Sequence, residues 1–536
     1  MKTFSTAVVL IGSVFCIGPH ASAVSPESIQ QGRQLFERSW SSQDPRVGSD
    51  GLGPVFNSDS CVVCHHQGGV GGSGDSRFNA QAIGIESIQF SAERTTAADL
   101  RVFLRSFYPG FVQPDGSILN TAALPHHSVA PQFAALRESI LKSAMARSSE
   151  EGGPESVDAT RLTSTTPIIF GNTIGANEIR AKARLFQRNT TSLFGAGLID
   201  SVEDSLIQQQ AKIQERHPEI SGRASILRDG QVGRFGWRAN VSRLAHFVDR
   251  ACANELGLET KRRRQPVDPT RPNYRNPAID VDDDQIDQMS KFIASLPAPD
   301  RQIPEETSAR NEITRGEAAF DSVGCAVCHI PTLGPATGIY SDLLLHDMGP
   351  YLYDYDAAEP HVVRQNVTRE VRMIPESIQL SYYGNPTTIA ANTTFTSKVL
   401  ESPRRSTETK DYVPLYIKRE LGSHDIREML NSSVRLSNPS ISLRGRFRDE
   451  VGLERQLQPS NTAQEWRTPP LWGLRDSPPY MHDGRAETVL EAIAMHDGES
   501  AGTRDRFLQL PLADRQAILA FLETLVAPPN VPQPAL

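Results

Sequence analysis

Two short stretches of the sequence place thiols and a histidine at a fixed spacing. CVVCH begins at Cys61 and CAVCH begins at Cys325. Two cysteines three positions apart can form thioether bonds to the two vinyl groups of a haem, and the histidine that follows can then ligate the iron. A four-thiolate zinc site and a disulfide are the alternatives. The zinc site leaves both histidines without a role, so we favour two covalently bound haem c groups.

This interpretation predicts two kinds of contact with each haem. The attachment points are the motif cysteines, and the axial iron ligands are the motif histidines: Cys61, Cys64, Cys325 and Cys328, with His65 and His329. Of the two remaining cysteines, Cys16 lies in the N-terminal segment and Cys252 stands alone. We interpret Cys252 as a small buried hydrophobic residue, because a disulfide framework would need scattered, even-numbered cysteines.

The sixth ligand of each iron decides between electron transfer and catalysis. A haem with both axial positions filled carries electrons, whereas an open position can bind peroxide or dioxygen. The second motif has six histidine or methionine candidates: His346, Met348, Met481, His482, Met495 and His496. After the first motif, neither type occurs from Gln67 to Pro125, and His126 and His127 are the nearest later ones. We therefore predict an open or weakly held sixth position at the first haem.

The elements that must position the two motifs are repeated along the chain. Before each motif, an isoleucine, a glycine and a phenylalanine recur at i, i+3 and i+7, which is one face of a helix: Ile29, Gly32 and Phe36, then Ile313, Gly316 and Phe320. Each half closes with an apolar segment that ends at a proline, 284–299 and 513–528, at a constant offset of 229 (528 − 299). The repeated glycine indicates close approach by another helix, so we expect the opening and closing helices of each half to cross.

These repeats predict a mainly α fold, with two c-type cytochrome domains in tandem, long irregular insertions and a few short strands. We expect an N-terminal domain with the reactive haem over 24–299, a linker over 300–310, and a C-terminal domain with the electron-relay haem over 311–536. Residues 1–23 have a basic start, a short apolar run and a small-residue cleavage pattern, which predict a signal peptide. We expect a soluble protein that is periplasmic or otherwise exported.

Composition narrows the classes of partner. The 536 residues carry a formal net charge of −8, which is small for this length and gives no reason to expect nucleic acid or an anionic membrane. Beyond the N-terminus, no stretch approaches the ~20 apolar residues of a membrane-spanning helix. The expected partners are peroxide or dioxygen, together with a small electron-donor protein or a small-molecule reductant.

Several stretches resemble the bacterial dihaem cytochrome c peroxidase superfamily, and more closely its dihaem oxidoreductase branch, the so-called thiol oxidoreductases. They occur in the same order along nearly the whole chain: RNTTSLFGAGLID from Arg188, GRFGWRAN from Gly233, RGEAAFDSVGCAVCH from Arg315, SDLLLHDMGP from Ser341, RTPPLWGL from Arg467 and PPYMHDGRAETVLEAIAMHDGE from Pro478. In that superfamily the N-terminal haem reacts with peroxide, and the C-terminal haem relays electrons to it.

The resemblance also implies residue roles. The relay haem's sixth ligand follows the histidine of the MHDG motif by 14 residues, which leads from His482 to His496. The superfamily's tryptophan between the haems is missing from GAGLIDSV, and Trp237 takes over the electron path or is a core residue. The superfamily's acidic general base falls near Glu219 by spacing, where the alternative is a surface glutamate. His346 and His482 are then left with hydrogen-bonding roles.

Three functions remain open at this point. The first is a peroxidase-like dihaem enzyme, the second an electron-transfer cytochrome without catalysis, and the third a haem oxygenase or oxidative maturase that acts on an organic or protein substrate. The shortage of ligands after His65 favours the first and third over the second. The sequence does not separate the first from the third.

Overall fold

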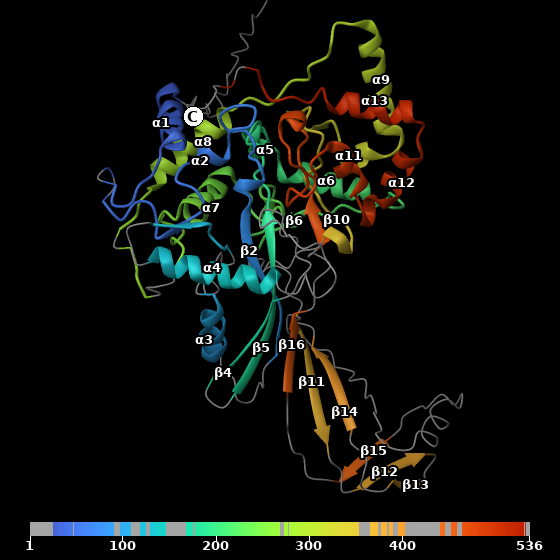
Figure 1. The fold of residues 1–536 in the computed structure, drawn as a ribbon. Helices are drawn as coiled ribbons and strands as arrows, with labels where there is room; N and C mark the ends of the chain where they lie inside the picture. Colours follow the sequence, from blue (N-terminus) through green and yellow to red (C-terminus); the bar gives the residue numbers. More distant parts are fainter. Residues whose placement is uncertain are drawn as a thin grey trace, which may run out of the picture.

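A computed structural model gives the fold (Figure 1). It describes residues 25–44, 46, 48–89, 97–108, 118–124, 129–145, 168–174, 177–267, 273–276, 278–352, 365–373, 377–382, 385–389, 395–401, 440–444, 452–457, 464–529 and 531. The predicted signal peptide, 1–23, lies outside these ranges, as do His126 and His127. Among the described residues, no helix has both the length and the apolar character needed to cross a membrane.

Two pairs of packed helices form the frame of the helical body. Helix α1 (Pro26–Glu37) packs on α8 (Asp283–Ser295), and α9 (Thr307–Ser322) packs on α13 (Leu512–Leu522). Figure 1 shows the first pair at the upper left and the second at the upper right. The predicted opening and closing helices of each half are therefore confirmed.

Glycine allows each pair to pack closely. A Cβ atom on Gly32 would overlap the carbonyl oxygen of Gln288, and one on Gly316 would overlap that of Ala517. The two contacts are related by the offset seen in the sequence (517 − 288 = 229). Both glycines are buried in their helices. The predicted close approach of a second helix at these glycines is confirmed in both halves.

Replacing Gly316 by alanine is expected to destabilise the C-terminal helix pair by about 3 kcal/mol, because the added methyl group meets backbone that cannot rotate away. Thermal unfolding followed by circular dichroism measures the effect. Gly48→Ala is the matched control, because a Cβ atom there meets nothing within 4 Å. Equal unfolding temperatures for the two variants would contradict the packing argument.

Between the two pairs, shorter elements connect the halves. Their bounds are α2 (Cys61–Cys64), α5 (Ala196–Ser201), α6 (Asp204–Gln214), α7 (Leu244–Leu256), α11 (Val489–Ala494), α12 (Ala501–Gln509), β1 (Val55–Phe56), β3 (Ala122–Ala123), β6 (Ser225–Ile226), β7 (Val232–Gly233), β8 (Thr332–Leu333), β9 (Ala336–Thr337), β10 (Leu345–Asp347) and β17 (Glu465–Arg467). One hydrophobic core contains residues of both predicted domains, among them Phe292, Leu344 and Trp472. The Gln214 amide also donates to the Val327 carbonyl at 2.8 Å. The division at 300–310 therefore stays a prediction, and this core extends across both halves.

A six-stranded antiparallel sheet extends below the helices (Figure 1). Its order is β14 (Phe395–Glu401), β11 (Gln365–Met373), β16 (Gly452–Leu457), β2 (Ala80–Gln89), β5 (Asn177–Arg188) and β4 (Ile168–Ile174). Farther out, β13 (Asn385–Ile389), β12 (Ser377–Tyr382) and β15 (Ser440–Arg444) form a three-stranded sheet. Helices α3 (Ala97–Phe107) and α4 (Val129–Met145) pack beside β4. Strands of 10 and 12 residues, β2 and β5, exceed the short strands that we expected.

Candidate functional site

Both CxxCH motifs adopt the same local turn. The backbone N–H of His65 donates to the carbonyl of Cys61 at 3.0 Å, and that of His329 donates to Cys325 at 3.0 Å. One turn therefore brings the two thiols and the histidine of each motif together. The described cysteines, including Cys252, are all free thiols. The two pairs line different cavities, so the described residues form neither a disulfide nor a four-thiolate zinc site.

Hydrogen bonds hold the two motif histidines in equivalent orientations. His65 Nδ1 lies 3.0 Å from the carbonyl oxygen of Gly72, and His329 Nδ1 lies 2.8 Å from that of Tyr340. In each ring, Nδ1 then carries the proton and Nε2 keeps its lone pair. Burial lowers the pKa of both imidazoles to about 4, so both are neutral near pH 7. A neutral imidazole held in this way is the form that ligates a metal.

Buried phenylalanines link each helix pair to its motif. The ring centre of Phe36 lies 5.3 Å from that of Phe292 and 6.3 Å from that of His65. In the second half, Phe320 lies 5.3 Å from the matching phenylalanine of α13 and 6.4 Å from His329. The helix repeat recognised in the sequence therefore positions the two histidines in the same way.

Each motif lines its own cavity, and the two cavities share a wall. The first cavity, of about 260 Å³, is lined by Cys61, Cys64 and His65. The second, of about 290 Å³, is lined by Cys325, Cys328 and His329. Nine of the described residues line both: Asn189, Thr190, Thr191, Leu193, Gly236, Trp237, Leu244, Phe247 and Arg467.

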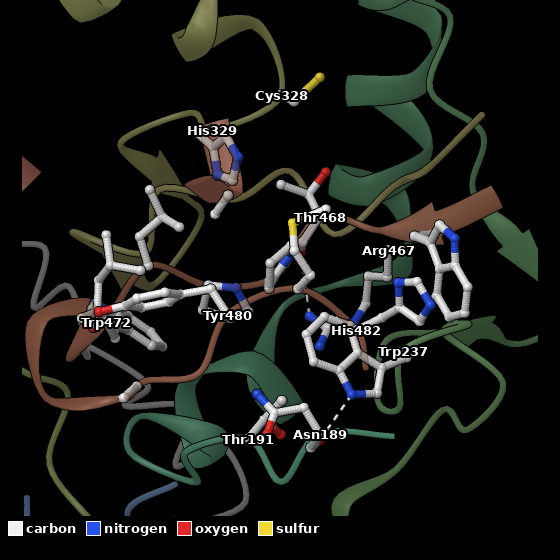
Figure 2. A pocket seen from close by; sticks show the side chains of 18 of the residues that line it. Asn189, Thr191, Trp237, Cys328, His329, Arg467, Thr468, Trp472, Tyr480 and His482 are labelled. Carbon is white, nitrogen blue, oxygen red and sulfur yellow. Dashed lines mark hydrogen bonds between the residues drawn. The ribbon is translucent and has the colours of Figure 1, made fainter. Parts of the chain in front are cut away.

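Trp237 is held rigidly in this shared wall. Its indole Nε1 donates to the carbonyl of Asn189 at 3.0 Å, and its own carbonyl accepts the backbone N–H of Arg467 at 2.9 Å (Figure 2). Its ring meets that of His482 edge-on, with centres 6.4 Å apart. The sequence predicted Trp237 on an electron path or in the core. The structure places an aromatic ring system at the boundary of both cavities.

His496 faces His329 across the second cavity. Its Nδ1 lies 2.7 Å from the carbonyl oxygen of Ala492, which leaves Nε2 available, and burial lowers its pKa. The ring centres of the two histidines are 6.5 Å apart. Because a metal–imidazole bond is about 2 Å long, two imidazoles on opposite sides of one iron have ring centres roughly 6 Å apart. The observed pair fits that spacing.

His346 and His482 also line the second cavity, but each contacts other side chains. His346 lies between two carboxylates, with Nε2 3.0 Å from Asp342 and Nδ1 3.0 Å from Glu499. Burial alone would lower the pKa of His346, but the Asp342 carboxylate and the Cys328 sulfur raise it well above its usual value. The His482 ring stacks on Trp466 with centres 3.6 Å apart. Met495 lies outside the residues that line the cavity.

The first cavity offers fewer ligands. Among the described residues that line it, His65 is the only histidine and Met289 the only methionine. Met289 lies one helical turn before Phe292 on α8, and its counterpart in the second half is Ile518 (289 + 229), which lines the second cavity at the same place. The Met289 position is therefore a packing position of the helix pair. Cys252, which we interpreted as a buried hydrophobic residue, is buried and also lines this cavity.

Glu219 is not part of the first cavity, which corrects the spacing-based prediction. Its carboxylate accepts a hydrogen bond from Arg506 Nη1 at 3.0 Å, and both side chains are more than 40% exposed. Glu219 lies in the irregular segment after α6, and its partner Arg506 belongs to α12 in the C-terminal half. This placement matches the surface alternative.

Glu255 is instead the only carboxylate among the described residues that line the first cavity. It is half-buried at the end of α7, and its Oε2 accepts a hydrogen bond from the Asn57 amide at 2.5 Å. Burial raises its pKa, and the Asn57 hydrogen bond opposes that rise. The sequence held a signal for it: Val248, Cys252 and Glu255 recur at i, i+4 and i+7, so they share the helix face that lines the cavity.

The residues present fit a haem in each cavity. Each cavity combines a pair of thiols, a neutral histidine with Nε2 available, and walls that are largely apolar. These are the donors and surroundings that c-type haem requires. The two sites differ in their histidines: among the described lining residues, the second has a further histidine opposite its motif histidine and the first does not.

Comparison with known proteins also indicates a dihaem oxidoreductase. Residues 453–525 match the family described as "Di-haem oxidoreductase, putative peroxidase", so the resemblance to dihaem oxidoreductases is confirmed over that segment. Hydrazine synthase of Kuenenia stuttgartiensis is 16% identical, with 63% of this chain and 73% of that chain covered and a TM-score of 0.26. A MauG-like protein associated with microbial copper homeostasis is 14% identical, with 62% and 94% covered and a TM-score of 0.25. No curated protein matches the chain.

Proposed function

We propose that the chain is an exported, dihaem c-type redox enzyme that is peroxidase-like. It reduces peroxide at the N-terminal haem with electrons relayed through the C-terminal haem. Each haem is covalently attached in its own cytochrome c-like domain. The electrons come from a small electron-donor protein or a small-molecule reductant. The reduction of one H₂O₂ consumes two electrons and two protons and yields two water molecules.

The difference between the two cavities carries this proposal. The second has two buried histidines, His329 and His496, whose ring centres are 6.5 Å apart. The first has His65 but no second histidine among its described lining residues. A six-coordinate haem carries electrons, whereas a five-coordinate haem can bind peroxide. This asymmetry supports catalysis at the first cavity and electron relay at the second.

The chain's own residues would divide the work as follows. When bound, the two haems supply a peroxide-binding iron in the first cavity and an electron-exchanging iron in the second. The Gly72 and Tyr340 carbonyls fix the ring orientations of His65 and His329. Glu255 accepts a proton from one peroxide oxygen and returns it to the departing one. Trp237, fixed in the shared wall, supplies the aromatic path between the cavities.

Spectroscopic titration of the protein as isolated tests this proposal. We expect a pyridine haemochrome assay to give two c-type haems per chain. Peroxide and cyanide should alter a high-spin signal and leave a low-spin signal unchanged. The same titration with dioxygen tests for oxygenase chemistry. A wholly six-coordinate, unreactive protein would instead identify an electron-transfer cytochrome.

A further inference from the structure

Arg467 carries a buried positive charge in the wall that the two cavities share. The residue is 7% exposed and lies at the end of β17, opposite Leu345 of β10. Burial lowers the pKa of its guanidinium to about 10. A buried charge costs free energy unless an opposite charge lies against it. The guanidinium of Arg467 is therefore expected to have an anionic partner.

No protein carboxylate in the described part of the chain pairs with Arg467. Its Nε donates to the Gly236 carbonyl at 2.9 Å, and its Nη1 lies 3.4 Å from the Thr468 carbonyl. Both acceptors are backbone carbonyls, and among the described residues Arg467 forms no ion pair within 4 Å. The carboxylate whose charge acts on it is Asp342, but Asp342 is already engaged by His346 at 3.0 Å and by the Gln214 amide at 2.7 Å.

Among its described lining residues, the first cavity has more arginines than carboxylates. Four of these residues are arginines and one is a glutamate: Arg188, Arg238, Arg250 and Arg467, with Glu255. Arg238 is also buried, and its guanidinium carbon lies 3.7 Å from the centre of the Trp466 ring. A planar guanidinium binds carboxylates through two parallel hydrogen bonds, so a cavity with this lining matches a ligand that carries carboxylate groups.

We propose that Arg467 holds a carboxylate of the group bound in the first cavity, namely a propionate of the haem attached at Cys61. This inference rests on the proposed function. Figure 2 shows Arg467 near Trp237, which also lines both cavities, and near His482, which lines the second. Arg467 is thus a positioning residue: it fixes the edge of the first haem against the wall that contains Trp237. Its charge also favours the reduced state of that haem, because reduction removes a positive charge at the iron.

The test is a reductive titration of the two-haem protein with Arg467→Gln. At a fixed ambient potential, the oxidised-to-reduced ratio of the high-spin haem should rise about tenfold. This corresponds to a fall of about 59 mV in the reduction potential of that haem, for a one-electron couple. The low-spin haem should change less. Arg262→Gln is the matched control: it removes the same charge from a side chain that is 46% exposed, pairs with Asp283 and lines neither cavity.

The possible outcomes distinguish a failure of the Arg467 assignment from a failure of the proposed function. Two haems with unchanged potentials, even at a lower unfolding temperature, would mean that Arg467 is only structural. A shift confined to the low-spin haem would also overturn the assignment to the first cavity. Fewer than two c-type haems in the wild-type protein would refute the proposed function itself. If Arg467→Gln does not fold, Arg467→Lys should give a smaller fall at the same haem, because a single ammonium loses the paired contact. No fall with lysine would overturn the inference.

Discussion

Glu255→Gln should lower peroxide turnover by about 10²-fold or more while both haem spectra stay as in the wild type. General acid–base catalysis contributes typically about 10²–10⁴-fold, and an amide cannot accept and return a proton as a carboxylate can. The substitution keeps the size of the side chain and its contact with Asn57. Stopped-flow kinetics with peroxide measure the loss.

Glu219→Gln is the matched control for this prediction. Glu219 was the base implied by spacing, yet it pairs with Arg506 and lines neither cavity. Its substitution should leave turnover within about twofold of the wild type, the range expected of an exposed ion pair. If Glu219→Gln were slow and Glu255→Gln normal, the placement of the catalytic base in the structure would be wrong.

The pH profile gives a second readout for Glu255. Burial raises its pKa, so its carboxylate is lost at a higher pH than that of an exposed glutamate. Peroxide turnover should then fall as the pH drops through this raised pKa, and the fall should begin above the usual carboxyl range. In Glu255→Gln this acid limb should disappear. If the acid limb of the pH profile were unchanged in Glu255→Gln, the group that titrates there would not be Glu255.

The parts of the fold that could be predicted depend on short-range pattern. The spacing of Gly32 and Phe36 is fixed within two helical turns, and its repetition at Gly316 and Phe320 revealed both helix pairs. The large sheet could not be seen in this way. Its central strands β2 and β5 are separated by 87 residues (177 − 89 − 1), and no short-range sequence pattern indicates that they pair.

The site residues that could be predicted from the sequence are likewise those that lie in a short-range pattern. The ligands of the CxxCH motifs are local, and the structure places each set on one turn beside one cavity. The base is not local. Spacing pointed to Glu219, in the segment after α6, whereas the carboxylate that lines the first cavity, Glu255, lies on α7. Arg467 stands in one of the stretches that carry the resemblance. Its importance comes from its burial without an ion-pair partner in the described part of the chain, which only the three-dimensional arrangement discloses.

His496→Ala should abolish the low-spin signal of the second haem and slow steady-state peroxide turnover by at least about tenfold, or about 1.4 kcal/mol in the barrier. His496 is the histidine that faces His329 with its Nε2 available, since Nδ1 is bound to the Ala492 carbonyl. Alanine removes that ligand, so the iron becomes five-coordinate or takes water, and the relay of electrons to the first cavity slows. EPR spectra of the oxidised protein report the spin state.

Two further variants decide whether ligation is the cause. His496→Met should restore a six-coordinate, low-spin haem at a higher reduction potential, because a thioether favours ferrous iron more than an imidazole does. Met495→Leu changes the adjacent residue, which is 36% exposed and does not line the cavity, and should leave the spectrum unaltered. Cyanide should still bind the first haem in all three proteins, because that site lies beyond the shared wall. Retention of the low-spin signal in His496→Ala would transfer the ligand role to one of the other residues that line the second cavity, with Met348 and Met481 the first to be replaced.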